Sequence, residues 1–238
     1  MRKLAVAAVF AFLFALPQAV QAESAIDPFL KPVPPGPPES GLSFGARVGF
    51  GAPLGRTSQG NDLSSAFSGS IPLQIDAGWR FNPNLYAGLY FQYGAAQINS
   101  ELRQACDANG VSCSSSDLRF GFDLVYAFLP RGRFAPWVGV GAGLETAKVN
   151  VAQAGSSAEL TLKGFEIAHL TAGLDLRFWP AFRFGPFANW TLAKYTSVDA
   201  SVDAVDPTTQ IGVTRSGDIP QKAFHGWLQF GVRAAIDL

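Results

Sequence analysis

The chain has few of the residues on which most metal and catalytic sites depend. Its 238 residues include only two cysteines, two histidines and one methionine. A structural zinc site takes about four ligands, and His169 and His225 lie far in sequence from Cys106 and Cys113. We therefore expect no metal and no cofactor. The mature chain also has no convincing helical period, which excludes an α-helical architecture.

The chain also has no excess of basic over acidic residues. The chain has 18 basic and 18 acidic residues, and removal of a leader containing Arg2 and Lys3 leaves 16 basic and 18 acidic residues. A mature chain with net charge −2 argues against a nucleic-acid-binding surface, which needs a basic face. We expect no nucleic acid among its partners.

The first 40 residues are typical of export and tethering segments. A charged start, an apolar run over 4–16 and the small residues of Val20-Gln21-Ala22 predict a signal peptide over 1–22. The apolar run is shorter than the roughly 20 residues that a membrane-spanning helix needs. Residues 23–40 contain six prolines and predict an extended periplasmic tether. A docking motif for a partner is the alternative interpretation of that segment.

Cys106 and Cys113 lie seven positions apart in a polar stretch. In an exported protein such a pair predicts a disulfide. Closing so short a loop restrains the unfolded chain by roughly 2–3 kcal/mol in the entropic description.

The stretch 71–95 shows a strict period of two. Apolar side chains occupy alternate positions on both sides of Asn82-Pro83-Asn84, from Ile71 to Phe81 and again from Leu85 to Ala95. Successive side chains of a β-strand point to opposite faces, and the Asn-Pro-Asn segment is typical of a tight turn. The stretch therefore predicts an antiparallel hairpin with one apolar face.

This pattern recurs along the rest of the chain. It predicts eight strands: 42–52, 71–81, 85–96, 118–128, 134–147, 165–178, 184–195 and 224–238. Short connections alternate strictly with long polar ones, which are 54–70, 99–116, 150–164 and 199–222. Membrane barrels sort their connections in this way, with short periplasmic turns and long outer loops. The sequence therefore predicts an all-β fold, an eight-stranded antiparallel up-and-down transmembrane β-barrel over 41–238.

The polar faces of the predicted strands hold five basic and five acidic residues and no lysine. They are Arg47, Asp76, Arg80, Arg119, Asp123, Glu145, Asp175, Arg177, Arg233 and Asp237. An enclosed lumen needs balanced charges because an unpaired buried charge is very costly. Eight strands leave room only for side chains, so we expect a filled barrel whose lumen holds this charge network.

Two local details follow from strand parity. The start of the sixth strand, 165–169, slips parity and predicts a β-bulge. A turn centred on Gly132 predicts that Arg119 pairs directly with Glu145 inside the barrel.

A soluble sheet with one solvated polar face is the alternative fold. Aromatic residues beside the short turns favour the membrane barrel, because barrels carry aromatic girdles at the bilayer interfaces. These residues are Phe81, Phe128, Phe134, Phe178, Trp179, Phe182 and Phe184.

With these features the chain resembles the eight-stranded outer-membrane barrels of the OmpA, OmpX and opacity-protein type over 41–238. The resemblance rests on architecture and on the alternating final strand, although that strand ends in Leu238 where the family usually has an aromatic. It implies residence in the outer membrane of a Gram-negative bacterium. It also implies outer-membrane lipid, lipopolysaccharide and the barrel assembly machinery as partners.

The resemblance favours a non-catalytic barrel that serves envelope integrity or surface interaction through its four long connections. A small-solute channel and an outer-membrane enzyme are the alternatives. Neither His169 nor His225 stands in an obvious Ser-His-acid grouping, so we expect structural histidines. Asp199, Asp203 and Asp206 could bind Ca²⁺, but their spacing is not that of an EF-hand and favours a solvated acidic loop.

Overall fold

A computed structural model describes residues 36–58, 61–153, 156–179, 181–205 and 210–238. All of them belong to one unit, Pro34–Leu238. The predicted signal peptide and most of the predicted tether therefore lie outside the described residues. Of the tether only 36–40 is described, and there Glu39 forms an exposed ion pair with Arg131 of a short turn, at 2.7 Å.

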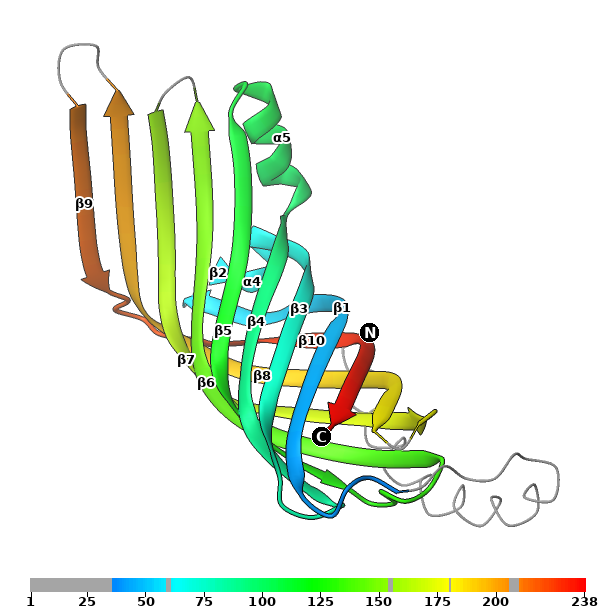
Figure 1. The fold of residues 1–238 in the computed structure, drawn as a ribbon. Coiled ribbons are helices and arrows are strands. Elements are labelled where there is room, and N and C mark those ends of the chain that lie inside the picture. The colour runs from blue at the N-terminus through cyan, green and yellow to red at the C-terminus, as the bar shows by residue number, and fades with distance from the viewer. Residues whose placement is uncertain (1–35, 59–60, 154–155, 180, 206–209) are drawn as a thin grey trace. The chain divides into compact units, whose positions relative to one another are not determined.

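Eight long strands form a closed antiparallel ring (Figure 1). In chain order they are β1 Gly41–Ser58, β3 Phe67–Arg80, β4 Leu85–Ile98, β5 Ser112–Ala127, β6 Phe134–Gln153, β7 Ser156–Arg177, β8 Phe182–Val205 and β10 Phe224–Asp237. Each strand pairs with the next along this series, and β10 pairs with both β8 and β1. The predicted eight-stranded up-and-down barrel is confirmed.

The barrel is inverted relative to a soluble protein. Its outward side chains are apolar and its inward side chains are polar. Ile75 and Phe122 are each 57% exposed, whereas Arg119 is only 1% exposed. Soluble proteins rarely bury charged residues or expose a continuous apolar surface. A bilayer around the ring removes this cost on the outside, and paired charges remove it on the inside.

The two local predictions from strand parity are also confirmed. Arg119 is the direct pairing partner of Glu145 across β5 and β6. The register of β7 against β8 shifts between Glu166 and Ala168, which places a bulge at Ile167. Because the bulge changes the parity of the strand, Glu166 and His169 both point inward, although they are three positions apart.

The long connections are more regular than the sequence suggests. The segment 150–164 is a hairpin that continues β6 and β7, paired as far as Gln153 and Ser156. Most of 199–222 is a second hairpin, in which β9, Gln210–Asp218, pairs with β8 from Ser197 to Val205. Strand pairing thus continues beyond the point at which the outward residues change from apolar to polar.

Two of the long connections also contain short helices, which the sequence pattern did not reveal. The segment 54–70 contains β2, Asn61–Asp62, and the short helix α4, Leu63–Ala66. The segment 99–116 contains α5, Ser100–Ala108. Asn99 caps α5 by accepting from the backbone N–H of Glu101 at 3.2 Å, and Gly110 follows with φ +63°. A helix of nine residues is too short to show a clear period in sequence.

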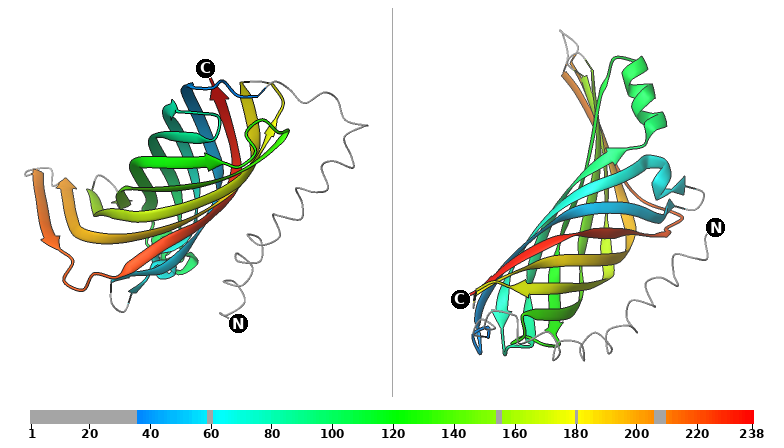
Figure 2. Two further views of the ribbon diagram at one scale, coloured as in Figure 1. Left: turned by 90° about the horizontal axis from the view of Figure 1, so that it is seen from below. Right: turned by 90° about the vertical axis from the view of Figure 1, so that its right-hand side faces the viewer.

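Figure 2 presents the ring from two further directions. The outer parts of β5, β6, β7 and β8 continue beyond the ring and form, together with β9, one twisted sheet, which we call the extension. The end of the ring at the short turns is called the turn end, and the opposite end is called the mouth.

We expect a charge at a lipid-facing position of β10 to destabilise the barrel. Phe230 is 53% exposed and pairs with Phe50 and Ala188 on the outer surface. Phe230→Arg should cost about 2–4 kcal/mol near the bilayer midplane. Urea unfolding in liposomes measures this cost, with Phe230→Leu as the matched control. Equal stability of the Arg and Leu variants would show that the outward face is assigned wrongly.

Candidate functional site

The interior of the barrel is a continuous network of paired charges. The structure buries all ten charged residues expected in the lumen: Arg47, Asp76, Arg80, Arg119, Asp123, Glu145, Asp175, Arg177, Arg233 and Asp237. It adds Asp117, Glu166 and Arg183, which parity alone did not place there. Glu166 was missed because the bulge reverses the parity of β7, and Arg183 because it lies just after a short turn.

Arg119 is the centre of the charge cluster nearest the mouth. Its Nε lies 2.9 Å from Asp117, its Nη2 lies 3.1 Å from Glu145 and its Nη1 lies 3.2 Å from Glu166. All four side chains are at most 3% exposed. A planar guanidinium can serve three carboxylates at once because its donors point in different directions. One cation thus joins the three neighbouring strands β5, β6 and β7 inside the lumen.

Glu145 extends this cluster toward β8 and β10. The phenol of Tyr195 donates to its Oε1 at 3.2 Å, and His225 Nε2 lies 3.1 Å from its Oε2. The rings of Tyr195 and His225 stack with centroids 4.0 Å apart. Both oxygens of Glu145 therefore have partners, as a buried carboxylate requires.

His169 joins the mouth cluster to the middle of the barrel. Its Nδ1 contacts Glu166 and its Nε2 contacts Asp123. His169 therefore links two of the seven carboxylates that the interior holds, together with six arginines, among the described residues. Asp123 also binds Arg47 Nη2 at 2.8 Å.

A third group of charges lies at the turn end. Asp237 accepts hydrogen bonds from Ser43 at 2.7 Å and from Arg183 at 2.9 Å, and it pairs with Arg80 at 3.1 Å. Asp175 beside it accepts from the indole of Trp137 at 2.9 Å and pairs with Arg183 at 3.2 Å. Through Asp237, the last strand is thus tied to β1, β3 and β8.

Aromatic and apolar side chains fill the space between the charges. The guanidinium of Arg233 lies 4.4 Å from the ring centroid of Trp137, a cation–π contact. Toward the mouth, Leu63 of α4 packs with Phe67 and Trp227, all at most 3% exposed. We call these three residues the plug. The plug covers the charge network on the side of the mouth.

The two histidines are enclosed rather than presented to a substrate. His169 is 4% exposed and His225 is 1% exposed. Across the described residues, three of their four ring nitrogens contact carboxylates, His225 Nδ1 has no hydrogen-bond partner, and none of the four contacts a serine hydroxyl. Within the described part of the chain, no group of three or more His, Cys, Asp or Glu side chains could hold a metal ion. No helix in this part of the chain is long and apolar enough to cross a membrane.

The extension reverses the polarity of the barrel wall. Along β6, the outward residues change from Leu144 to Thr146 and Lys148, while the inward residues change from Glu145 to Ala147 and Val149. Directly paired residues share a face, so this reversal passes to β7 and β8. The outer apolar belt ends at Leu144, which marks the outer limit of the lipid-facing surface on this strand.

Polar pairs cover the outer face of the extension. Lys148 lies 3.2 Å from Glu159, and Lys163 lies 2.8 Å from Asp199. Hydrogen bonds from Thr161 and Lys148 hold the pKa of Glu159 below its ordinary value. A hydrogen bond from Lys163 likewise lowers the pKa of Asp199. Asp199 is thus engaged by a lysine, and Asp206 of the acidic segment lies outside the described residues.

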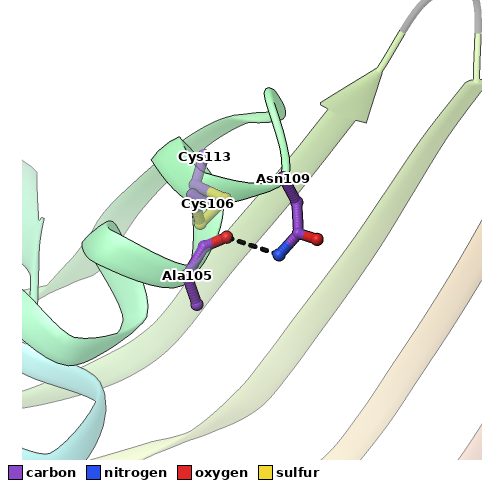
Figure 3. The surroundings of a disulfide bond; sticks show 4 residues. All are labelled: Ala105, Cys106, Asn109 and Cys113. Carbon is purple, nitrogen blue, oxygen red and sulfur yellow. Dashed lines mark hydrogen bonds between the residues drawn. A yellow bond between two sulfur atoms is a disulfide. The ribbon is translucent and has the colours of Figure 1, made fainter.

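The predicted disulfide between Cys106 and Cys113 is confirmed. Figure 3 shows it joining α5 to the start of β5. At the end of α5, the side chain of Asn109 donates to the carbonyl of Ala105 at 2.7 Å. Cys113 pairs with Val151 of β6 and so lies on the inner face. The bond therefore fixes α5 beside the edge of the extension that β5 forms.

No protein-family model matches the chain, and no curated protein matches it in sequence. Solved structures do match. A major outer membrane protein from Thermus thermophilus is similar with a TM-score of 0.53 and 11% identity, over 83% of this chain and 99% of that one. This similarity supports the fold: the chain forms an eight-stranded β-barrel of the outer-membrane type.

Two further structures cover similar shares of the chain. Neisserial surface protein A is 16% identical with a TM-score of 0.45, over 83% of this chain and 99% of that one. Ail, the attachment invasion locus protein of Yersinia pestis, is 11% identical with a TM-score of 0.43, over 81% and 98%.

We expect the contact between Arg119 and Glu145 to appear as a coupling energy. Arg119→Met should cost about 3–5 kcal/mol because it leaves three enclosed carboxylates without their cation. Combined with Glu145→Gln, the two losses should differ from additivity by about 0.5–3 kcal/mol. Urea unfolding of the four proteins measures the cycle. Arg119→Met combined with Asp237→Asn, at the turn end, is the control and should be additive. Additivity in the first cycle would contradict the contact.

We expect the disulfide to hold α5 without holding the barrel. Replacing Cys106 and Cys113 by serine should leave the ring folded, because its strands pair independently of this bond. The segment 99–116 should then be cut faster by protease, since the restraint on its ends is lost. Limited proteolysis with mass spectrometry locates the cuts, and heat-modifiable gel mobility reports the barrel. Unchanged cutting in 99–116 would refute this role.

Proposed function

We propose that this eight-stranded barrel is a non-catalytic outer-membrane protein that engages a surface partner through its extension. The observation that carries the proposal is the continuation of β5–β9 beyond the apolar belt as a regular sheet. In this arrangement outer-membrane lipid and lipopolysaccharide surround the belt, and the barrel assembly machinery inserts the chain. A role in envelope integrity requires only the ring and leaves the presence of the extension unexplained.

The edge of the extension supports binding of an extended polypeptide. Among the described strands, β9 pairs with β8 alone, so its second edge has no strand beside it. An exposed strand edge presents backbone donors and acceptors to which another strand can add. The opposite edge differs, because the disulfide fixes α5 at β5. The sheet thus offers one open edge for a partner.

The two alternative functions have less support. A channel needs a continuous wet path, but the cluster around Arg119 reaches from β5 to β10 through His225 and Trp227, and the plug lies above it. An enzyme that uses histidine needs the imidazole within reach of a substrate, but both histidines are at most 4% exposed. Surface binding through the extension is therefore the function that these contacts favour.

Shortening the β8–β9 hairpin tests the proposal. Asp199 and Ser216 are direct partners, so replacing 200–215 by Asn-Gly closes the hairpin with a two-residue turn in register. Cells that display the parent chain should adhere to at least one surface in a panel coated with fibronectin, laminin or mucin. The shortened chain should lose that adhesion while it remains folded by heat-modifiable mobility.

Pro83→Ala in a short turn is the matched control and should adhere as the parent does. Undiminished adhesion of the shortened chain would refute the role of the extension. Absence of adhesion by the parent to every surface of the panel would also count against a surface-binding function.

A further inference from the structure

The inner face of the extension has no role in the network of charges below it. Directly paired residues place Val149, Leu160, Leu162 and Val198 on this face. The face continues toward the free tip with Val202 and Val213, which are 50% and 51% exposed. Arg215 on β9 also lies on this face, where its charge interrupts the apolar surface. An exposed apolar surface above the lipid belt is costly in water and marks a binding site.

A cavity lies where this face meets the rim of the mouth. Its volume is about 530 Å³, within the range of roughly 300–1,000 Å³ that is typical of small-molecule pockets. Its lining comes from the inner face of β6, β7 and β8 and from the end of β1 together with α4 and the start of β3. The segment between β9 and β10 closes the cavity through Ile219, Pro220 and Gln221.

The lining specifies the chemistry of the ligand. None of the described residues that line the cavity is charged, and its polar side chains are Thr57, Ser58 and Gln221. An ionised headgroup would lose its hydration here without gaining a counter-charge from the lining. A long aliphatic chain gains by burial, and a hydroxyl or ester group has polar side chains within the same cavity. The lining therefore suits a neutral amphiphile.

The floor of the cavity separates it from the interior of the barrel. Phe67 lines the cavity and belongs to the plug, where its ring centroid lies 6.2 Å from that of Trp227. Beneath the plug lies the cluster around Arg119, whose guanidinium is 6.0 Å from the ring centroid of Trp227. A ligand in the cavity thus reaches a closed floor, which suits retention rather than passage.

A second cavity beside it has a different character. Its volume is about 430 Å³, and its lining includes Ser64, Gln97, Asn99 and Arg103. These polar and charged side chains do not suit an aliphatic chain. Of the two cavities, the one under the extension is therefore the better site for an aliphatic chain.

We propose that the cavity between the extension and the plug is a binding site for a neutral aliphatic molecule, of the class of long-chain alcohols and their uncharged esters. Such a molecule reaches the mouth from outside and lies with its chain against Leu160, Leu162 and Val198. Its polar end meets the hydroxyl and amide groups of the rim. This activity is separate from partner binding at the edge of β9.

Photo-cross-linking of the full barrel in lipid nanodiscs tests the site. The probe is a dodecanol derivative with a diazirine on its chain, and mass spectrometry locates the adducts. We expect adducts at 57–58, 66–67, 160–162 and 219–221 that excess dodecanol displaces. Labelling there should fall at least about tenfold in Leu162→Asp, because a charge in the cavity opposes burial of the chain.

Val202→Asp is the matched control, since Val202 lies on the same inner face outside the cavity, and it should keep full labelling. Ala66→Phe provides an uncharged test that fills the cavity and should also lose labelling. Heat-modifiable mobility checks that each variant is folded. If Leu162→Asp fails to fold, the result of Ala66→Phe decides.

Three outcomes would overturn the proposal. Adducts confined to the outer apolar belt would mean that the probe only dissolves in lipid. Displacement by dodecanoate but not by dodecanol would show that the site selects an anion. Equal labelling of the parent and of folded Ala66→Phe would place the ligand elsewhere.

Discussion

The pairing of enclosed charges is the constraint on which the rest of this structure depends. A ring of eight strands in a bilayer has lipid on its outside and too little room inside for bulk water, so every inward charge needs a partner from the chain itself. Arg119 meets three carboxylates, and Asp237 meets Arg80, Arg183 and Ser43. These contacts link strands across the lumen and oppose slippage of their register.

The bulge at Ile167 completes this network. Without it, Glu166 and His169 would point to opposite faces, and one of them would lie in lipid. The extra residue lets β7 supply Glu166 to Arg119 and His169 to Asp123. A local irregularity of one strand thus supplies two members of the interior network, and their contacts offset the break in its ladder.

The reversal of polarity along β6 sets the limit between membrane and exterior. Below it the wall is apolar outside and charged inside. Above it the outer face carries ion pairs such as Lys148–Glu159, and the inner face carries Val149 and Leu160. One continuous strand can serve both environments because its period of two is kept while the residue types exchange faces. The proposed partner edge and the proposed apolar site both lie in the part above this limit.

The sequence by itself determined the ring, its polar lumen, the Arg119–Glu145 register, the bulge and the disulfide, because a period of two and the turn lengths are local properties. Tertiary structure decided what local patterns do not encode. It showed that the long connections contain α5 and two distal hairpins, since a nine-residue helix and a reversed alternation lack a clear signal. It also brought His225 to Glu145 and His169 to Asp123. These partners lie many residues apart, and only the pairing of the strands between them places them in contact.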